Sequence, residues 1–359
     1  MNTLQINQFS FTAENYHKIL CNEFPDFLRK YLSLPVLTRL KGVGLLCGTD
    51  WTPLFHNSFF YSRFDHSVGT ALIAWNFTHD KKQALASLFH DVSTPAFSHV
   101  NDFRKGDALN QEATETDNAK IIYSEKNLQS LLQEDDVCIE EICDYHKFNI
   151  CDNNLPALSS DRLEYMFPSG ASLNNVWTLD EVKAQYEDIC VLKNEQGLSE
   201  LGFSDSDLCL SYTKKFLETS LILQKHEDKI AMQLMADVLS EAIKENILVE
   251  DDLFILSEKE IIDRFSQEAK VKADSKFSVL YNTFRNMKAV ERSDCKKDGY
   301  YNLNIEVKKR YINSLVKIDS SGNAKRISEI CDDAKKLIDD FMGFKDSEWG
   351  CVKLAGDVN

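Results

Sequence analysis

The stretch RFDHSVGTALIAWNFTHDKKQALASLFHDVSTPAFSHVND, residues 63–102, decides the fold of this chain. Two segments within it repeat apolar residues at helical spacing, which predicts two consecutive helices. His66 lies near the start of the first helix, whereas His90 and Asp91 close the second. Because consecutive antiparallel helices bring opposite ends together, these imidazole and carboxylate groups are expected to meet.

This pattern of side chains indicates a metal site. Imidazole and carboxylate are ligands of divalent transition metals, and Mn, Fe, Co, Ni or Zn would each fit. A further acid is expected from much later in the chain, where LSSDRLEYMF (residues 158–167) starts a helix with Ser159 or Ser160 as its N-cap. The predicted metal ligands are His66, His90, Asp91 and Asp161. His79 is excluded, because the adjacent Asp80 reads as the N-cap of the second helix.

The length and composition of the chain predict a mainly α-helical protein. With 359 residues and 43% hydrophobic content it can bury a large core, and only 13 Gly and 6 Pro suit a helix-rich fold. A helical core is expected over residues 1–250, with the long periodic segment 210–248 forming two helices that break near His226.

A smaller α+β region is expected over residues 251–359. Three segments in it, FSVLYNTF (277–284), YNLNIEVKK (301–309) and RYINSLVKI (310–318), alternate apolar and polar residues as half-buried strands do. The following SSGN predicts a turn, and ISEICDDAKKLIDDFMGF predicts an amphipathic helix. The last ten residues are expected to be loose.

Charge and composition limit the partners of the chain. A net charge of −16 argues against non-specific binding of nucleic acid, because neutralising phosphates requires a clustered positive surface. The first twenty residues lack the basic and apolar regions expected of a signal peptide, and no run approaches a membrane-spanning length. Ten scattered cysteines without a C-x-x-C pair are typical of reduced thiols. We therefore expect a cytoplasmic protein without a membrane partner.

Three motifs carry a resemblance to a known family: RFDHSVG (63–69), LFHDVSTPAFSH (88–99) and SSDRLEYM (159–166). Their order and content resemble the HD-domain phosphohydrolase superfamily. Within it, the chain is similar to the deoxynucleotide triphosphohydrolase branch that includes the sterile-alpha-motif/HD protein. Weaker similarity covers TRLKGVG (38–44) and the helices over residues 210–248, so that about two thirds of the chain is included. The resemblance implies an HD-domain helical core.

The resemblance also implies roles for individual residues. The four predicted ligands match the metal ligands of the family. Arg63 and Arg162 match basic residues near the phosphates, where their forked guanidinium groups suit phosphate oxygens. Tyr165 takes the place of a tyrosine that packs against the sugar. His99 matches a histidine that lines the phosphate site, and Asp102 an acid that supports the catalytic group.

The chain departs from the family pattern at four positions. Thr94 replaces a histidine used near the reactive phosphate, and Gln111 replaces another histidine in the pair Gln111-Glu112. Leu45 falls where a glutamine would contact the 3′-hydroxyl, and Ser169 where an aspartate would. Glu112 is therefore the expected general acid or base, provided that burial raises its pKa.

Together the residues and the resemblance predict metal-dependent hydrolysis of a phosphate ester or anhydride in a nucleotide-like small molecule. The expected catalytic residues are His99, Asp102, Gln111 and Glu112. The expected substrate-binding residues are Arg63, Thr94, His146, Arg162 and Tyr165. A second metal, with Mg among the candidates, could be held by Glu112 and His146. No role is expected for His17. The branch commonly forms homo-oligomers, although no interface is specified.

Two other functions remain open. One is a di-iron oxygenase, since some HD proteins add histidines between the His-Asp pair and the last aspartate. The other is a nucleotide-binding sensor that has lost turnover.

Overall fold

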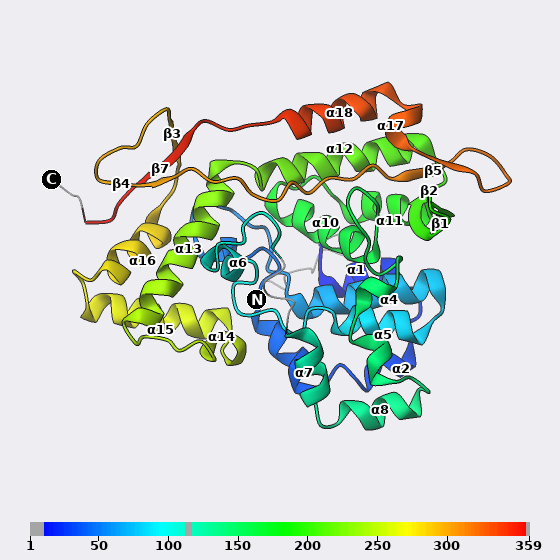
Figure 1. The fold of residues 1–359 in the computed structure, drawn as a ribbon, viewed down its shortest axis with the longest axis horizontal. Coiled ribbons are helices and arrows are strands. Elements are labelled where there is room, and N and C mark those ends of the chain that lie inside the picture. Colours follow the sequence, from blue (N-terminus) through cyan, green and yellow to red (C-terminus); the bar gives the residue numbers. More distant parts are fainter. Residues whose placement is uncertain (1–10, 112–116, 357–359) are drawn as a thin grey trace, which may run out of the picture.

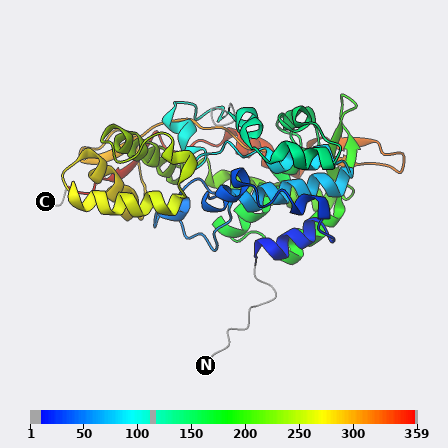
Figure 2. The same cartoon turned by 90° about the horizontal axis from the view of Figure 1, so that it is seen from below.

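Helices dominate the structure. The computed structural model describes residues 11–111 and 117–356. Two small sheets lie among the helices (Figure 1), so the expected fold class, mainly α with a small β portion, is confirmed. Seen from below, the yellow helices lie at one end of an elongated molecule, and most of the blue and cyan helices lie from its middle to the other end (Figure 2). None of the helices in the described part of the chain has both the length and the apolarity needed to span a bilayer.

The two helices predicted from the deciding stretch are present as α4 (Arg63–Thr78) and α5 (Lys81–Phe89). Ser62 caps α4 in a reciprocal capping box with Asp65, which satisfies two amides at the start of the helix. Asp80 caps α5 by accepting a hydrogen bond from the Lys82 amide at 2.9 Å, as predicted. His66 therefore lies one turn into α4, and His90 directly follows α5.

A third helix, α10 (Ser160–Leu173), packs against α4 and carries Asp161 in its first turn. Its N-cap is Ser159, one of the two predicted candidates. Pro168 lies inside this helix and has no amide hydrogen for the carbonyl of Glu164 one turn earlier. The hydroxyl of Tyr16 on α1 (Ala13–Leu20) donates to that carbonyl at 3.1 Å, so the N-terminal helix supplies the missing hydrogen bond.

The long periodic segment forms α12 (Ser206–Ile222) and α13 (His226–Lys244), with the predicted break at His226. After α15 (Glu258–Val271), the strand predicted over residues 277–284 is wrong, because this segment belongs to the helix α16 (Lys276–Asn286). Phe277, Leu280, Tyr281 and Phe284 are all buried, and their spacing of three, four and seven residues follows one face of a helix. Over only eight residues, such a helical repeat of aromatic and apolar residues can be mistaken for the alternating pattern of a strand.

The other helices are short or peripheral. They are α2 (Asp26–Arg29), α3 (Pro35–Thr38), α6 (Val100–Arg104), α7 (Asn118–Ser124), α8 (Leu128–Glu134), α9 (Ile139–Ile142), α11 (Leu179–Asp188), α14 (Asp252–Ile255), α17 (Ile327–Ile330) and α18 (Asp332–Gly343). The helical part of the predicted C-terminal segment is thus divided between α17 and α18, with Cys331 between them.

The strands form two separate sheets. One has the order β1 (Ile189–Lys193), β2 (Ser199–Phe203), β5 (Leu315–Lys317) and β6 (Ala324–Arg326), and only its β2–β5 pair is parallel. The other is antiparallel, with β7 (Trp349–Lys353) between β3 (Glu291–Ser293) and β4 (Tyr300–Leu303). The expectation of a loose C-terminus is therefore wrong at β7, which pairs with strands on both sides. Of the strands predicted over residues 301–318, only β4 and β5 form.

Two hydrophobic clusters make up most of the core. The first surrounds α4, α5 and α10. The second joins α13, α15 and α16 to residues 96–103. Neither cluster is confined to one side of residue 250, because Ile312 and Val316 pack in the first cluster and Ile230 in the second. A domain boundary near residue 250 stays a prediction.

Candidate metal centre and its cavity

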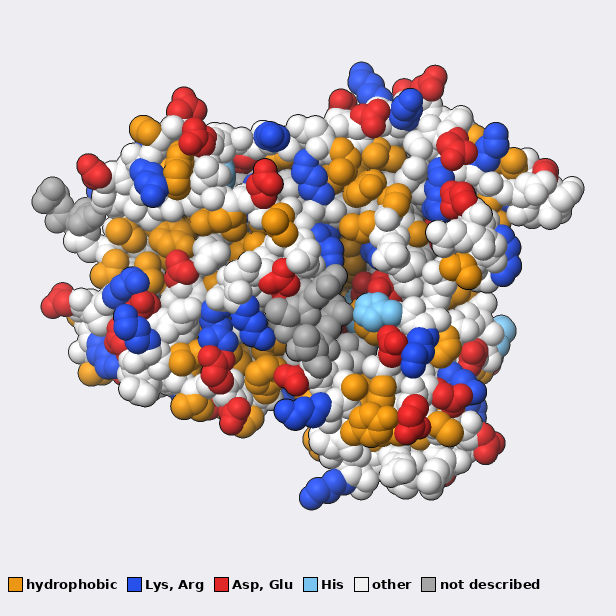
Figure 3. All heavy atoms as spheres, in the orientation of Figure 1, with side chains coloured by type: hydrophobic (Ala, Val, Ile, Leu, Met, Phe, Trp, Pro, Cys, Tyr) orange, Lys and Arg blue, Asp and Glu red, His pale blue; other side chains and the backbone are white. Residues whose placement is uncertain are grey.

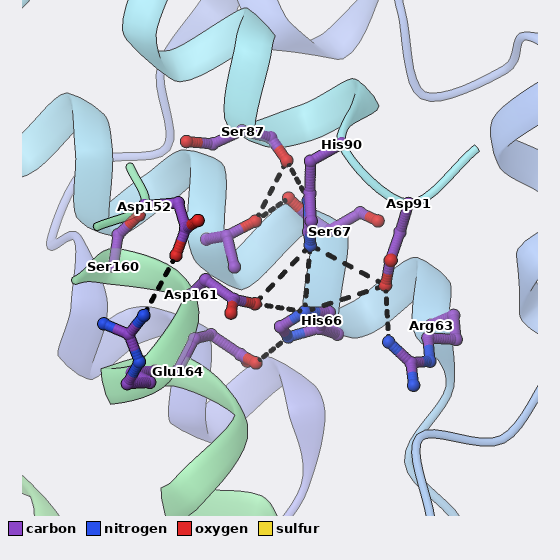
Figure 4. Close-up of polar contacts among 12 residues, drawn as sticks. Arg63, His66, Ser67, Ser87, His90, Asp91, Asp152, Ser160, Asp161 and Glu164 are labelled. Carbon is purple, nitrogen blue, oxygen red and sulfur yellow. Dashed lines mark hydrogen bonds and ion pairs between the residues drawn. The ribbon is translucent and has the colours of Figure 1, made fainter. Parts of the chain in front are cut away.

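The four side chains predicted as metal ligands point toward one centre (Figure 4). The Nε2 atoms of His66 and His90 are 3.2 Å apart, and Asp161 Oδ1 lies 3.1 Å from the first and 3.6 Å from the second. Asp91 Oδ2 lies 3.7 Å from each Nε2 atom. Ligands bound to one transition metal at about 2.1 Å are separated by roughly 3 to 3.5 Å. The two histidines and Asp161 therefore fit a single ion, and Asp91 lies beside them.

Both imidazoles are held with Nε2 toward the centre. His90 donates its Nδ1 hydrogen to the Ser87 carbonyl at 2.6 Å. His66 donates its Nδ1 hydrogen to the carboxylate of Glu164. These bonds fix the tautomer in which each Nε2 keeps a lone pair, as a metal-binding histidine requires. Both rings are almost fully buried, so their orientation is fixed by packing as well.

Glu164 is itself supported by a chain of buried and partly buried groups that the sequence did not predict. Tyr61 donates its hydroxyl to Glu164 Oε1 at 2.6 Å. His17 Nε2 lies 3.1 Å from that hydroxyl oxygen and 3.0 Å from the Asp65 carbonyl. Burial lowers the pKa of His17 to about 4, which keeps its ring neutral. The spacing of Glu164, three residues after Asp161 on the same helix, is the signal that could have revealed this support.

Gly69, in the RFDHSVG motif, gives Glu164 the space it occupies. A Cβ atom at Gly69 would lie 2.7 Å from Glu164 Cγ, closer than carbon atoms approach. We expect Gly69→Ala to displace Glu164 from His66 and to weaken metal binding by about 10- to 100-fold. Titration with Zn²⁺ against a chromogenic chelator measures this affinity. Gly343→Ala, at a helical glycine with no atom within 4 Å of the added carbon, is the matched control. Equal affinity in both variants would contradict the role of Glu164.

Asp91 is held by two donors besides the histidines. Its Oδ2 accepts from Arg63 Nη1 at 2.8 Å, and its Oδ1 accepts from the Thr94 hydroxyl at 3.0 Å. Burial opposes ionisation of Asp91, but the charge of Arg63, which is the largest opposing effect, and its hydrogen bond help to hold the pKa well below the usual value. Asp91 is thus an anion. Thr94, predicted to contact substrate, uses its hydroxyl to orient this carboxylate.

His99 and Asp102 form a second pair beside the centre. His99 Nδ1 and Asp102 Oδ2 are 2.8 Å apart, the arrangement by which a carboxylate orients an imidazole. Burial lowers the pKa of His99, so its ring is neutral. Phe97 and Ser98 precede it with φ angles of 63° and 50°, in the left-handed region that residues other than glycine rarely adopt. This turn places His99 on the cavity wall.

A cavity of about 1070 Å³ opens over the metal centre. Its walls include both histidines and both aspartates of the centre, together with Arg63, His99, Gln111, His146, Arg162 and Tyr165. Lysine and arginine side chains alternate with acidic ones on the face shown in Figure 3, without one large basic patch. A cavity of this volume is of the size that holds a small molecule.

No protein-family model matches the chain, and no curated protein matches its sequence. Solved structures do share its architecture. A hypothetical protein from Aquifex aeolicus superposes with a TM-score of 0.61 at 14% identity over 92% of each chain. A phosphohydrolase from Bacteroides thetaiotaomicron superposes with a TM-score of 0.57 at 14% identity, over 92% of this chain and 97% of that one. The fold is similar to that of a phosphohydrolase. Identity this low shows the fold alone.

Two other predicted substrate-binding residues line the cavity, but their side chains already interact with other groups of the chain. Arg162 lines it, but its Nη1 and Nη2 atoms donate within the chain, to Ala157 and Asp152 among others. His146 is half exposed, and its Nδ1 lies 2.8 Å from Asp152 Oδ2. Phosphate contact by Arg162 stays a prediction. Glu112 lies outside the described residues, and so does its pairing with His146 at a second metal.

Arg310 and Asp228 are among the cavity residues that were not predicted from the sequence. Arg310 comes from the segment between β4 and β5, and Asp228 from the first turn of α13. Burial raises the pKa of Asp228 to about 7, although the charges of Arg310 and Lys229 oppose this rise. Neither residue lies in a recognisable motif, so no local signal could have identified them.

Proposed function

We propose that this chain is an HD-type, metal-dependent phosphohydrolase that cleaves a phosphate ester or anhydride in a nucleotide-like small molecule. The observation that carries the proposal is the cluster of two Nε2 atoms and two carboxylate oxygens, 3.1–3.7 Å apart where measured, at the base of a 1070 Å³ cavity. The similarity to the fold of a known phosphohydrolase supports it, as do the three sequence motifs.

His66, His90, Asp91 and Asp161 would hold the metal. When bound, such an ion acts as a Lewis acid toward a phosphate oxygen and lowers the pKa of water. Two buried imidazoles and two carboxylates suit this role, because they balance much of the charge of a divalent ion and keep coordination positions open. Mn, Fe, Co, Ni and Zn all remain candidates.

The other residues of the site would handle phosphate and protons. Arg63 donates one hydrogen bond to Asp91 and one to Ser98. Its position next to the centre suits contact with a phosphate bound there. His99 has Nδ1 engaged by Asp102, which leaves the lone pair of Nε2 to take a proton from the attacking water. Tyr165 on the cavity wall offers an aromatic surface to a sugar.

Metal removal tests the proposal. Purified full-length protein is expected to contain a transition metal, to lose phosphate release after chelation, and to regain it with one of the five metals added singly. The substrates to screen are nucleoside mono-, di- and triphosphates and simple phosphate esters, with inorganic phosphate, pyrophosphate and triphosphate measured as products. Dioxygen uptake by the Fe-loaded protein without phosphate release would instead indicate an oxygenase. Tight nucleotide binding without hydrolysis would indicate a sensor.

A further inference from the structure

An extended segment from the C-terminal region crosses the cavity. Residues 304–314, here called the strap, join β4 to β5 without regular secondary structure and run along the molecule as the orange chain in Figure 1. The amide of Lys308 donates to the Ala108 carbonyl at 3.2 Å, and the amide of Asn313 donates to the Pro156 carbonyl at 2.9 Å. The strap is therefore hydrogen-bonded to loops on either side of Arg310.

Arg310 extends from the strap into the cavity. Its guanidinium carbon lies 5.9 Å from the ring centroid of Tyr165, and its Nη2 donates to Gln111 Oε1. In the described part of the chain, no carboxylate lies within ion-pair distance of Arg310. A guanidinium has five N–H donors, so most of those of Arg310 remain for a ligand. The ring of Tyr165 and the amide of Gln111 hold the group in place without neutralising its charge.

The other two arginines of the described cavity wall are more fully engaged. Arg63 forms an ion pair with Asp91 at 2.8 Å, and Arg162 one with Asp152 at 3.2 Å. Their charges are balanced within the chain. Of these three arginines, Arg310 therefore has the least compensated charge, in a cavity that also contains several acids.

We propose that Arg310 is an anion-binding residue of this site and that it takes up a phosphate group of the substrate. The proposal rests on the proposed function, because its ligand is the phosphate compound that the metal centre would cleave. Arg310 affects the titration of His99 and Tyr165 electrostatically, so its charge acts within the same cavity as the metal centre. The strap would thus complete the site with a residue from the C-terminal region.

The surroundings of Arg310 favour an anion over an internal partner. Asp228 is a buried carboxyl group whose titration Arg310 affects, yet the two groups form no ion pair. Because burial raises the pKa of Asp228 to about 7, part of this group is neutral at physiological pH and competes weakly for the guanidinium. A phosphate oxygen, which stays charged at that pH, is the stronger partner.

Arg310→Gln in the full-length, metal-loaded protein tests the proposal. Loss of a forked, charge-assisted contact with phosphate corresponds to at least about a 10-fold weaker interaction. We expect that loss in the Kd of inorganic tripolyphosphate, measured by calorimetry, and an equal rise in KM for any hydrolysed compound. Metal content should stay at the wild-type level. Lys317→Gln removes the same charge from an exposed position on β5 and should change neither quantity.

The two proposals fail in different ways. Wild-type tripolyphosphate affinity in a folded Arg310→Gln variant overturns the role of Arg310, even if the protein is a phosphohydrolase. A wild-type protein that neither binds nor hydrolyses phosphate compounds overturns the proposed function itself. Should Arg310→Gln not fold, Arg310→Lys decides the matter, since it keeps the charge and stem but loses the fork. A threefold or greater rise in the Kd of tripolyphosphate supports the proposal, and any smaller change overturns it.

Discussion

Asp161→Ala is expected to remove the metal and to lower phosphate release by at least about 1000-fold, because the loss of metal-ion catalysis raises the barrier by several kcal/mol. Asp161 Oδ1 lies close to both ligand nitrogens, 3.1 Å from His66 and 3.6 Å from His90. It is also the one ligand contributed by α10 rather than by the α4–α5 hairpin. Without it, two neutral imidazoles and one carboxylate remain, and that carboxylate is already paired with Arg63.

Asp207→Ala is the matched control for this substitution. Asp207 is the second residue of α12, just as Asp161 is the second residue of α10, but its side chain is exposed. Both changes remove a negative charge from the first turn of a helix, which costs each protein a similar, small amount of stability. Elemental analysis and phosphate release should therefore differ between the two variants, whereas the thermal midpoints of their metal-free forms should be similar. Stoichiometric metal in Asp161→Ala would refute the assignment of this ligand.

Glu258→Ala is expected to lower the free energy of unfolding by about 4 kcal/mol, because it leaves three buried donors without acceptors at about 1–3 kcal/mol each. Glu258 lies on α15 and is fully buried. Its Oε1 accepts from the amides of Gly44 at 2.9 Å and Phe97 at 3.0 Å, and its Oε2 accepts from Trp51 Nε1 at 2.7 Å. The same substitution should reduce turnover, since the Phe97 segment precedes His99.

The expected loss depends on pH. Burial raises the pKa of Glu258 from 4.5 to about 7, so the folded protein binds this proton more tightly than the unfolded chain does. The resulting stabilisation is fully present below about pH 4.5 and is lost as the pH rises through about 7. Denaturant titrations should therefore show a larger effect of Glu258→Ala at pH 5 than at pH 8.

Glu260→Ala serves as the control for this second prediction. Glu260 belongs to the exposed capping box of the same helix, where it accepts hydrogen bonds from Ser257. Its removal should lower the free energy of unfolding only slightly, because this part of the capping box is exposed to solvent. A loss for Glu258→Ala no larger than this would show that Glu258 does not stabilise the protein by joining the Gly44 and Phe97 segments.

The sequence by itself determined the helical hairpin and the four side chains that meet at its end. These features depend on local rules: Ser62, Asp80 and Ser159 cap the helices that follow them, and apolar residues repeat at helical spacing. Such signals act within a few residues of the chain and can be read without knowing the fold. The placement of His66 and Asp161 follows from them, once the helices pack.

Only the tertiary structure decided the surroundings of that centre. Phe97 and Ser98 adopt left-handed backbone angles that neither residue prefers, in a turn whose Phe97 amide is bound by Glu258 from α15. Glu164 depends on the space at Gly69, and Arg310 reaches the cavity because the strap crosses it. Each of these contacts joins positions far apart in the chain, and their energies arise from burial and from satisfied hydrogen bonds. No local pattern of residues encodes such contacts, because they exist only when the packed helices bring the partners together.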